Sequence, residues 1–168
     1  MDTSPSFDIH DKKWLIPELT HFLLVCGDAG YATETFKVTE LDGSTTCAKE
    51  LDDWEKEDNY FGGEPFGGRE VAFYRGHVVW MMVYYGDIIV DEHQKETETY
   101  LRKVLSQKHA AWMPRGPAQY HTADGKWKYT NEFSGTIEKF HGSDRILREG
   151  VEVYSCKYAG GLVNYHKD

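Results

Sequence analysis

The sequence predicts an α+β protein in which two similar units, each a helix followed by an antiparallel hairpin, form one mainly antiparallel sheet or open barrel flanked by two helices. Two observations support this prediction. Segments with helical spacing alternate with runs of β-branched and aromatic residues, and a stretch near the middle of the chain recurs 74 residues later without a gap. The matched pairs are Glu64 and Glu138, Phe66 and Phe140, Gly68 and Gly142, Glu70 and Asp144, Gly76 and Gly150, Val79 and Val153, Trp80 and Tyr154, Tyr84 and Tyr158, and Gly86 and Gly160.

A constant offset over this length indicates two copies of one supersecondary unit, because loops normally drift in length. We expect repeat units at about 14–90 and 91–165, preceded by an N-terminal tail at 1–13. With 168 residues, 40% of them hydrophobic, the chain is long enough to bury a core of its own. A single domain, 1–168, is therefore the expected organisation.

Apolar residues at helical spacing predict the first helix from Trp14 to Cys26. Pro17 is tolerated in a first helical turn, and Gly27 supplies the stop. The apolar stripe consists of Leu15, Leu19, Phe22, Leu23 and Cys26. This helix is expected to be amphipathic and to pack on the sheet.

Residues 31–38 alternate weakly between apolar and polar types, which favours a strand. The following segment, Thr39–Asn59, is polar, acidic and rich in turn formers such as Asp42-Gly43 and Asp52-Asp53. We interpret Thr39–Asn59 as a long, mobile loop.

Dense aromatic and aliphatic runs at Glu70–Tyr74 and Val78–Tyr85 predict two strands, with Arg75-Gly76 as the tight turn between them. Alternation along the second strand puts its side chains on two opposite faces. One face holds Trp80, Met82 and Tyr84, and the other holds Met81, Val83 and Tyr85. We expect this strand to be central in the sheet and covered on both faces.

Helical spacing returns over residues 91–105, with Asp91 as the expected cap. The proline-bounded segment Trp112–Pro117 cannot be helical and is expected to cross an end of the sheet as an irregular bridge. A hairpin around Glu149-Gly150 then repeats the hairpin of the first unit. The strands expected in this part lie at Lys126–Phe133, Ile137–Phe140, Arg145–Arg148 and Val151–Tyr158.

The net charge of −9, from 19 basic and 28 acidic residues, disfavours direct binding to nucleic acid or to an anionic membrane. The polar N-terminus lacks the apolar core of a signal peptide, and no apolar run approaches the length of a membrane span. Three cysteines, Cys26, Cys47 and Cys156, fit neither a disulfide framework nor a zinc ribbon. We therefore expect a soluble cytoplasmic protein.

Residues 60–70 contain four glycines and resemble a phosphate-binding loop at first sight. A phosphate loop, however, leads from a strand into a helix N-terminus and usually carries a lysine, whereas these glycines lead into a strand. We interpret the glycines as positions of tight turns or close backbone approach. Phe66 and Phe140 are interpreted as equivalent core residues.

The candidate site residues lie mainly in the first hairpin. Glu64 and Glu70 are the candidate acid and base, because carboxylates near a two-fold junction can converge, and Arg115 on its stiff segment is a candidate counter-charge. The predicted ligand-binding residues are Glu64, Arg69, Glu70, Trp80, Tyr84, Tyr85 and Arg115. The structural alternative is that the acids accept backbone hydrogen bonds at turns and the aromatic residues belong to the core.

The sequence predicts no metal site and no cofactor. The eight histidines are scattered, without a His-x-His pair or a helical His-x-x-x-His pair. No serine lies in a Gly-x-Ser-x-Gly motif, and Cys156, beside Lys157 in an expected strand, is interpreted as buried and inert.

Four motifs follow one another in a specific order: Tyr60-Phe61-Gly62-Gly63-Glu64-x-Phe66-x-Gly68-x-Glu70, Gly76-x-x-x-Trp80-x-Met82-x-Tyr84-Tyr85-Gly86, Arg115-Gly116-Pro117 and Tyr158-x-Gly160-Gly161-Leu162. Together, over about residues 19–163, they resemble the uncharacterised family catalogued as domain of unknown function 5680. The resemblance implies a bacterial or archaeal module, in some members attached behind a helix-turn-helix segment as effector-sensing domains are. It implies no catalytic residues. Only about 13 residues precede the first helix here, too few for a helix-turn-helix, so a sensing role would be exercised alone or through a partner.

Three hypotheses about function follow, and the sequence leaves open whether the protein is an enzyme. The preferred one is a domain that binds a small molecule at the junction of its two repeats, as an effector-sensing module would. The second is a small cofactor-independent hydrolase or isomerase that uses Glu64 or Glu70 as acid or base. The third is a structural module that forms a homodimer.

Overall fold

A computed structural model of the chain describes residues 11–27, 37–107 and 110–163. It contains two α-helices, α1 (Lys12–Gly27) and α2 (Gln94–Leu105), and a short 3-10 turn, η1 (Asp91–His93), directly before α2. The strands are β1 (Lys37–Thr39), β2 (Thr45–Leu51), β3 (Trp54–Gly62), β4 (Phe66–Tyr74), β5 (His77–Ile88), β6 (Gln119–His121), β7 (Trp127–Thr136), β8 (Lys139–Arg148) and β9 (Val151–Leu162).

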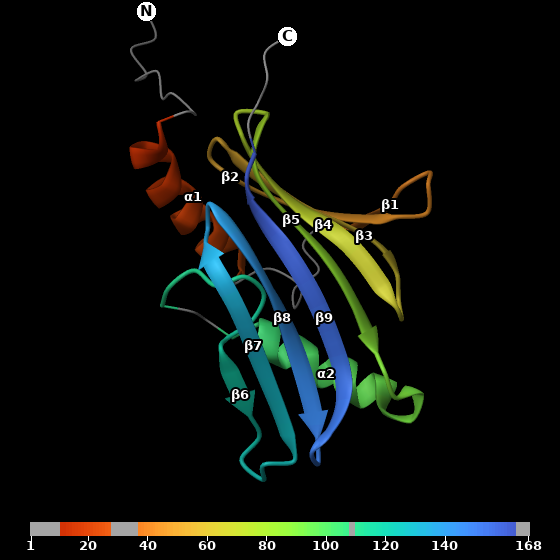
Figure 1. Cartoon of the computed structure of the whole chain (residues 1–168). Coiled ribbons are helices and arrows are strands. Elements are labelled where there is room, and N and C mark those ends of the chain that lie inside the picture. The colour runs from red at the N-terminus through yellow and green to blue at the C-terminus, as the bar shows by residue number, and fades with distance from the viewer. Residues whose placement is uncertain (1–10, 28–36, 108–109, 164–168) are drawn as a thin grey trace, which may run out of the picture.

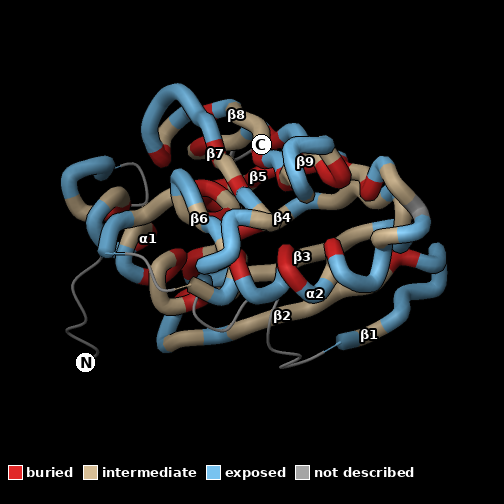
Figure 2. The backbone as a smooth tube through the Cα atoms, turned by 90° about the horizontal axis from the view of Figure 1, so that it is seen from below, coloured by how far each residue is buried: buried red, intermediate tan, exposed pale blue. Residues whose placement is uncertain are grey.

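In the described part of the chain, all nine strands form one antiparallel sheet in the order β1-β2-β3-β4-β5-β9-β8-β7-β6 (Figure 1). The sheet curves, and both helices lie on its concave side (Figure 2). The predictions of an α+β fold and of a mainly antiparallel sheet are confirmed. We call α1 to β5 the first half, α2 to β9 the second half, and the β5–β9 pair, where Tyr84 lies opposite Tyr158, the seam.

The helices cover the two halves separately. In α1 the predicted apolar stripe is buried, and Phe22 stacks on Trp54 of β3 with 5.3 Å between ring centres. In α2, Tyr100 packs on Trp127 of β7 with 5.1 Å between ring centres. The N-cap position of α2 is His93 rather than the predicted Asp91, because the 3-10 turn η1 takes up the residues before it.

The predicted alternation along β5 is confirmed. Trp80, Met82 and Tyr84 are buried on the concave side, whereas Val83 and Tyr85 on the convex side are 46% and 63% exposed. The strand is central in the sheet, as expected, but the prediction that it is covered on both faces is wrong. Both helices pack on the concave side, so no described helix covers the convex side.

The tight turns of the two predicted hairpins are confirmed. Arg75 and Gly76 have φ angles of 49° and 77°, and Glu149 and Gly150 have φ angles of 52° and 83°. Positive φ at both central residues is the requirement of a type I′ turn, which matches the twist of the flanking strands. The ladder shifts by one residue near each turn, between Ala72 and Phe73 and between Ile146 and Leu147.

The loop predicted at Thr39–Asn59 is wrong, because β2 and most of β3 lie there and pair with each other. Strand β3 carries Lys56 and Asp58 on its concave side, so it lacks the apolar alternation from which strands are recognised. Of the strand predicted at 31–38, only residues from Lys37 onward are among the described residues, and they begin β1. Trp112–Pro117 forms neither helix nor strand, as predicted.

Two glycines allow tyrosines to reach across a neighbouring strand. The Tyr84 side chain on β5 crosses Gly68 on β4, and its hydroxyl donates to Asp58 on β3 over 2.6 Å. A Cβ atom at Gly68 would lie 2.6 Å from that hydroxyl and 2.5 Å from a backbone oxygen of β3. The same arrangement joins Tyr158 and Gly142 in the second half. At these positions glycine is needed for close approach.

We predict that Gly68→Ala lowers the free energy of unfolding by about 1–3 kcal/mol, the usual cost of overpacking, because the new methyl group meets backbone that cannot move aside. The control is Gly63→Ala, where a Cβ has open space and φ is not in the left-handed region. Chemical denaturation of both variants measures the difference. Equal stability of the two variants would contradict the close-approach role of Gly68.

Candidate functional site

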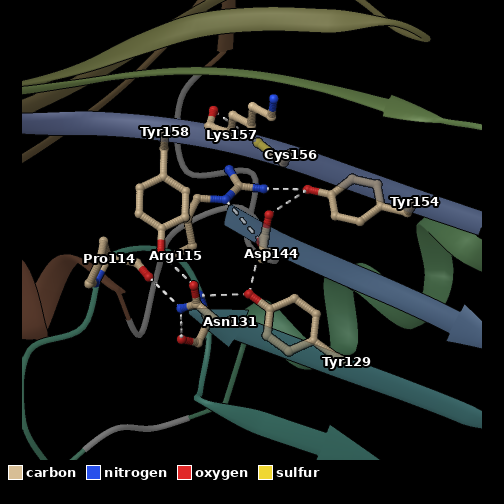
Figure 3. Close-up of polar contacts among 10 residues, drawn as sticks. Pro114, Arg115, Tyr129, Asn131, Asp144, Tyr154, Cys156, Lys157 and Tyr158 are labelled. Carbon is tan, nitrogen blue, oxygen red and sulfur yellow. Dashed lines mark hydrogen bonds and ion pairs between the residues drawn. The ribbon is translucent and has the colours of Figure 1, made fainter. Parts of the chain in front are cut away.

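A buried carboxylate, Asp144 on β8, lies at the centre of a hydrogen-bonded cluster beside the seam (Figure 3). It accepts hydrogen bonds from Tyr129 Oη at 2.8 Å and Arg115 Nε at 3.3 Å, and Tyr154 Oη lies 3.5 Å from its other oxygen. Arg115 Nη2 donates to Tyr154 Oη over 2.7 Å. Since the side chains of Arg115 and Asp144 are only 8% and 0% exposed, this is a buried ion pair.

Arg115 connects the two halves. Its guanidinium carbon lies 5.4 Å from the ring centre of Tyr84 in the first half, a cation–π distance, while its donors serve Asp144 and Tyr154 in the second half. Burial disfavours the charge, but Tyr154 and Asp144 more than compensate and raise the pKa of Arg115 well above its usual range. This guanidinium is therefore a permanent cation whose partners are side chains of the protein.

The irregular segment 114–116 covers the polar side chains of the second half. Asn131 Nδ2 donates to the carbonyl oxygens of Pro114 and Gly116, each over 2.8 Å. Gly116 N donates to Tyr129 Oη over 3.2 Å, and Tyr158 Oη donates to Asn131 Oδ1 over 2.5 Å. These contacts hold the chain's own backbone against the concave face of β7 and β8.

A second polar group, which we call the charged cluster, lies on the concave face of the first half and consists of Lys56, Asp58, Glu70 and Tyr84. Lys56 Nζ lies 2.8 Å from Glu70 Oε2. Tyr84 Oη donates to Asp58 Oδ1 over 2.6 Å. The charged cluster therefore combines an ion pair with a hydrogen-bonded carboxyl group.

The polar groups of the two halves occupy matching strand positions. Asp58 lies opposite Glu70 across β3 and β4, and Asn131 lies opposite Asp144 across β7 and β8. They differ in exposure: the side chains of Lys56 and Glu70 remain 15% and 20% exposed, whereas Asp144 has no exposed surface. Solvent can thus reach the charged cluster but not its counterpart.

The charged cluster contains a carboxyl group that titrates near neutral pH. Burial, followed by the neighbouring Glu70 carboxylate, raises the pKa of Asp58 to about 6, although the Tyr84 hydrogen bond and the Lys56 charge act in the opposite direction. Burial lowers the pKa of Lys56, but Glu70 outweighs this effect and raises it overall. Lys56 is therefore charged, while Asp58 can gain or lose a proton under mild conditions.

Three of the predicted site residues, Glu70, Tyr84 and Arg115, meet on the concave face. Two others make hydrogen bonds to the backbone. Glu64 accepts a hydrogen bond over 2.7 Å from the backbone amide of Ile88, the last residue of β5. The buried Trp80 donates from its indole nitrogen to the backbone oxygen of Ile137 over 3.0 Å.

The remaining two, Arg69 and Tyr85, lie on the convex side of the sheet and are exposed. Each directly neighbours a residue of the charged cluster in the sequence, so the alternation of a strand turns it to the opposite face. Sequence reasoning missed Lys56 and Asp58 because it assigned them to a loop. Extending the internal similarity upstream at an offset of 73 residues would have found them, since Trp54 then aligns with Trp127.

Residues 58–163, more than half of the chain, match the family described as Domain of unknown function (DUF5680). The chain belongs to this family. The match begins at Asp58 and includes Glu70, Tyr84, Arg115 and Asp144, but not Lys56. Comparison with curated proteins and with solved structures gave no significant match.

Two features are absent from the residues that the structure describes. Neither α1 nor α2 has the length and apolarity that a membrane crossing requires. No group of three or more His, Cys, Asp or Glu side chains in the described ranges is arranged to hold a metal ion.

We predict that Asp58 makes the stability of the protein depend on pH. Its folded pKa of about 6 exceeds the reference value of 3.8, so between these values the folded state retains a proton that the unfolded chain has released. The free energy of unfolding should therefore fall as the pH rises from about 4 to about 6.

Asp58→Asn should remove this slope and stabilise the protein at pH 7 by on the order of 2 kcal/mol, since the amide oxygen can still accept from Tyr84. Denaturant titrations of the wild type and the variant across the pH range measure the difference. Parallel pH profiles for the two proteins would show that the Asp58 pKa is not raised.

Proposed function

We propose that this member of the DUF5680 family binds a small polar molecule on its concave face, at Lys56, Asp58 and Glu70. The single observation that supports this proposal is a cluster of opposite charges that is largely desolvated yet still reached by solvent. Charges in such a setting interact strongly with a ligand, because little water competes with the contacts. Tyr84 and Arg115 form the adjoining wall toward the seam.

The charge balance of the cluster indicates which chemistry a ligand would bring. Lys56 compensates Glu70, but Asp58 lies beside Glu70, and repulsion between the two carboxyl groups contributes to the raised pKa of Asp58. A ligand with hydrogen-bond donors or positive charge would relieve that repulsion. The polar groups of a small molecule would then fix its orientation in the site.

We also infer that the two halves are copies of one ancestral unit, and that only the first copy has kept an accessible polar site. The pairing of Tyr84 with Tyr158 at the seam supports this view. In the second half, segment 114–116 occupies the space over the polar side chains. Reciprocal ring stacking across the seam, Trp80 on Phe140 and Tyr154 on Phe66, adds support.

Acid–base catalysis, as in a small hydrolase or isomerase, is the second candidate function. One observation favours it: a carboxyl group with a pKa of about 6 is close to the value at which a general acid or base works best near neutral pH. In this case Asp58, rather than Glu64 or Glu70, would transfer the proton. Glu64 is already bound to the backbone amide of Ile88.

The experiment that tests binding is native mass spectrometry of the purified protein, followed by calorimetry with any compound that co-purifies. Glu70→Gln should weaken binding of that compound by at least about tenfold, because it removes the charge that faces the ligand. The matched control is Glu57→Gln on the opposite face of β3, which should change the affinity less than about twofold. Equal affinities for the two variants would place the compound elsewhere on the protein.

The second candidate makes a different prediction for Asp58→Asn. The amide keeps the shape and the acceptor for Tyr84, so the affinity for the compound should stay within about tenfold of the wild type. Any turnover of the compound should be lost, because an amide cannot take up and release the proton. A variant that retains the wild-type rate would rule out Asp58 as the catalytic acid or base.

A further inference from the structure

A groove of about 540 Å³ lies between α2 and the β6–β7 hairpin, away from the residues of the charged cluster. Its volume is within the range of small-molecule sites, although the groove is open to solvent. Nine residues line it, among them the basic Lys95, Lys103, Lys126 and Arg148 and the aromatic Tyr100 and Trp127.

The charge of this groove is opposite to that of the whole protein. Four basic side chains face one acidic side chain, Glu96, on its surface, whereas the chain carries a net charge of −9. Glu96 lies 3.2 Å from Arg148, and Glu149 lies 3.6 Å from Lys126. Even after these two ion pairs are counted, Lys95 and Lys103 leave the groove positive.

Arg148 adds a hydrogen-bond donor and a flat surface. Its guanidinium carbon lies 5.4 Å from the ring centre of Trp127, and its side chain is 16% exposed. Its buried Nε has no hydrogen-bond partner among the described residues. The terminal nitrogens of Arg148 already contact Glu96 and His93, so Nε is the donor that remains for a ligand. A buried donor without a partner is costly, and an acceptor that reached it would be favoured.

In the first half, a tryptophan side chain fills the position that corresponds to the groove. Trp54 lies opposite Tyr74 in the β3–β4 ladder, as Trp127 lies opposite Arg148 in the β7–β8 ladder. In the first half, Trp14 of α1 packs on both rings, with ring centres 6.4 Å from Trp54 and 4.9 Å from Tyr74. Near Trp127, α2 contributes Tyr100, with 5.1 Å between the ring centres, together with lysines, and the groove beside them remains open.

We propose that this groove is a second binding site, for a flat aromatic anion. The ring of the ligand packs against Trp127, as Trp14 packs against Trp54 in the first half. Its phosphate or carboxylate group accepts a hydrogen bond from Arg148 Nε, once this side chain turns toward the groove, and is attracted by Lys95 and Lys103. The site is independent of the proposed function, because it shares no residue with the charged cluster.

The test uses 1-naphthyl phosphate as a probe, with binding measured by calorimetry at physiological ionic strength. The probe should bind saturably, and neutral 1-naphthol and inorganic phosphate should each bind at least about tenfold more weakly, because each lacks one of the two features. Glu70→Gln should leave probe binding unchanged. This last result would separate the groove from the charged cluster.

The decisive variant is the double substitution Lys95→Gln with Lys103→Gln, which should weaken probe binding by about tenfold. Its matched control, Lys128→Gln with Lys139→Gln, changes the net charge equally at exposed positions outside the groove and should change the affinity less than about twofold. Equal weakening by both double variants would overturn the proposal, because it would show attraction to overall charge. Absence of saturable binding below about 1 mM would overturn it as well.

Discussion

The buried ion pair between Arg115 and Asp144 is the constraint on which the concave face depends. A carboxylate without exposed surface costs several kcal/mol unless charge and hydrogen bonds compensate it. Asp144 obtains that compensation from a segment with no regular structure, so the ion pair fixes where residues 114–116 run. Once in place, their carbonyl groups satisfy Asn131, and the guanidinium group reaches Tyr84 across the seam.

The same ion pair explains why solvent reaches the polar side chains of the first half but not those of the second half. In the second half, backbone, guanidinium and tyrosine hydroxyl groups of the chain supply the side-chain hydrogen bonds that Asn131 and Asp144 make in the described structure. In the first half, Asp58 and Glu70 occupy the matching positions but share Lys56 and Tyr84 as partners. Two acids with one ammonium group form a less balanced arrangement, which is visible in the raised pKa of Asp58. This imbalance is the basis for the ligand site that we propose in the first half.

The sequence predicted those parts of the fold whose residues obey local rules. The stripe of α1, the turn at Arg75-Gly76 and the alternation of β5 were predictable because each depends on spacing or on a local backbone requirement. Strand β3 was not predictable in the same way. Its concave face carries Lys56 and Asp58, whose partners lie on other strands. A strand with charged residues on both faces is therefore predicted as a loop from its sequence.

The candidate site was predictable to a similar degree. Glu70, Tyr84 and Arg115 were identified from residue type and motif, and the fold brings them together. Arg69 and Tyr85 were assigned to the same site because they are neighbours in sequence, yet strand alternation turns them to the convex side. The partner of Arg115 could not be derived, since Asp144 is 29 residues away and meets it only through the pairing of β7 and β8.

The short outermost strands have a consequence for how copies of this protein associate. Among the described residues, β1 and β6 contain three residues each, and β1 pairs with Thr45–Cys47 of the seven-residue β2. Beyond them, β2 continues with Lys49 and Glu50, and charged residues at a sheet margin discourage a foreign strand from docking. A nine-stranded sheet could otherwise grow indefinitely by adding molecules side by side. The charged residues at the β2 margin disfavour such growth.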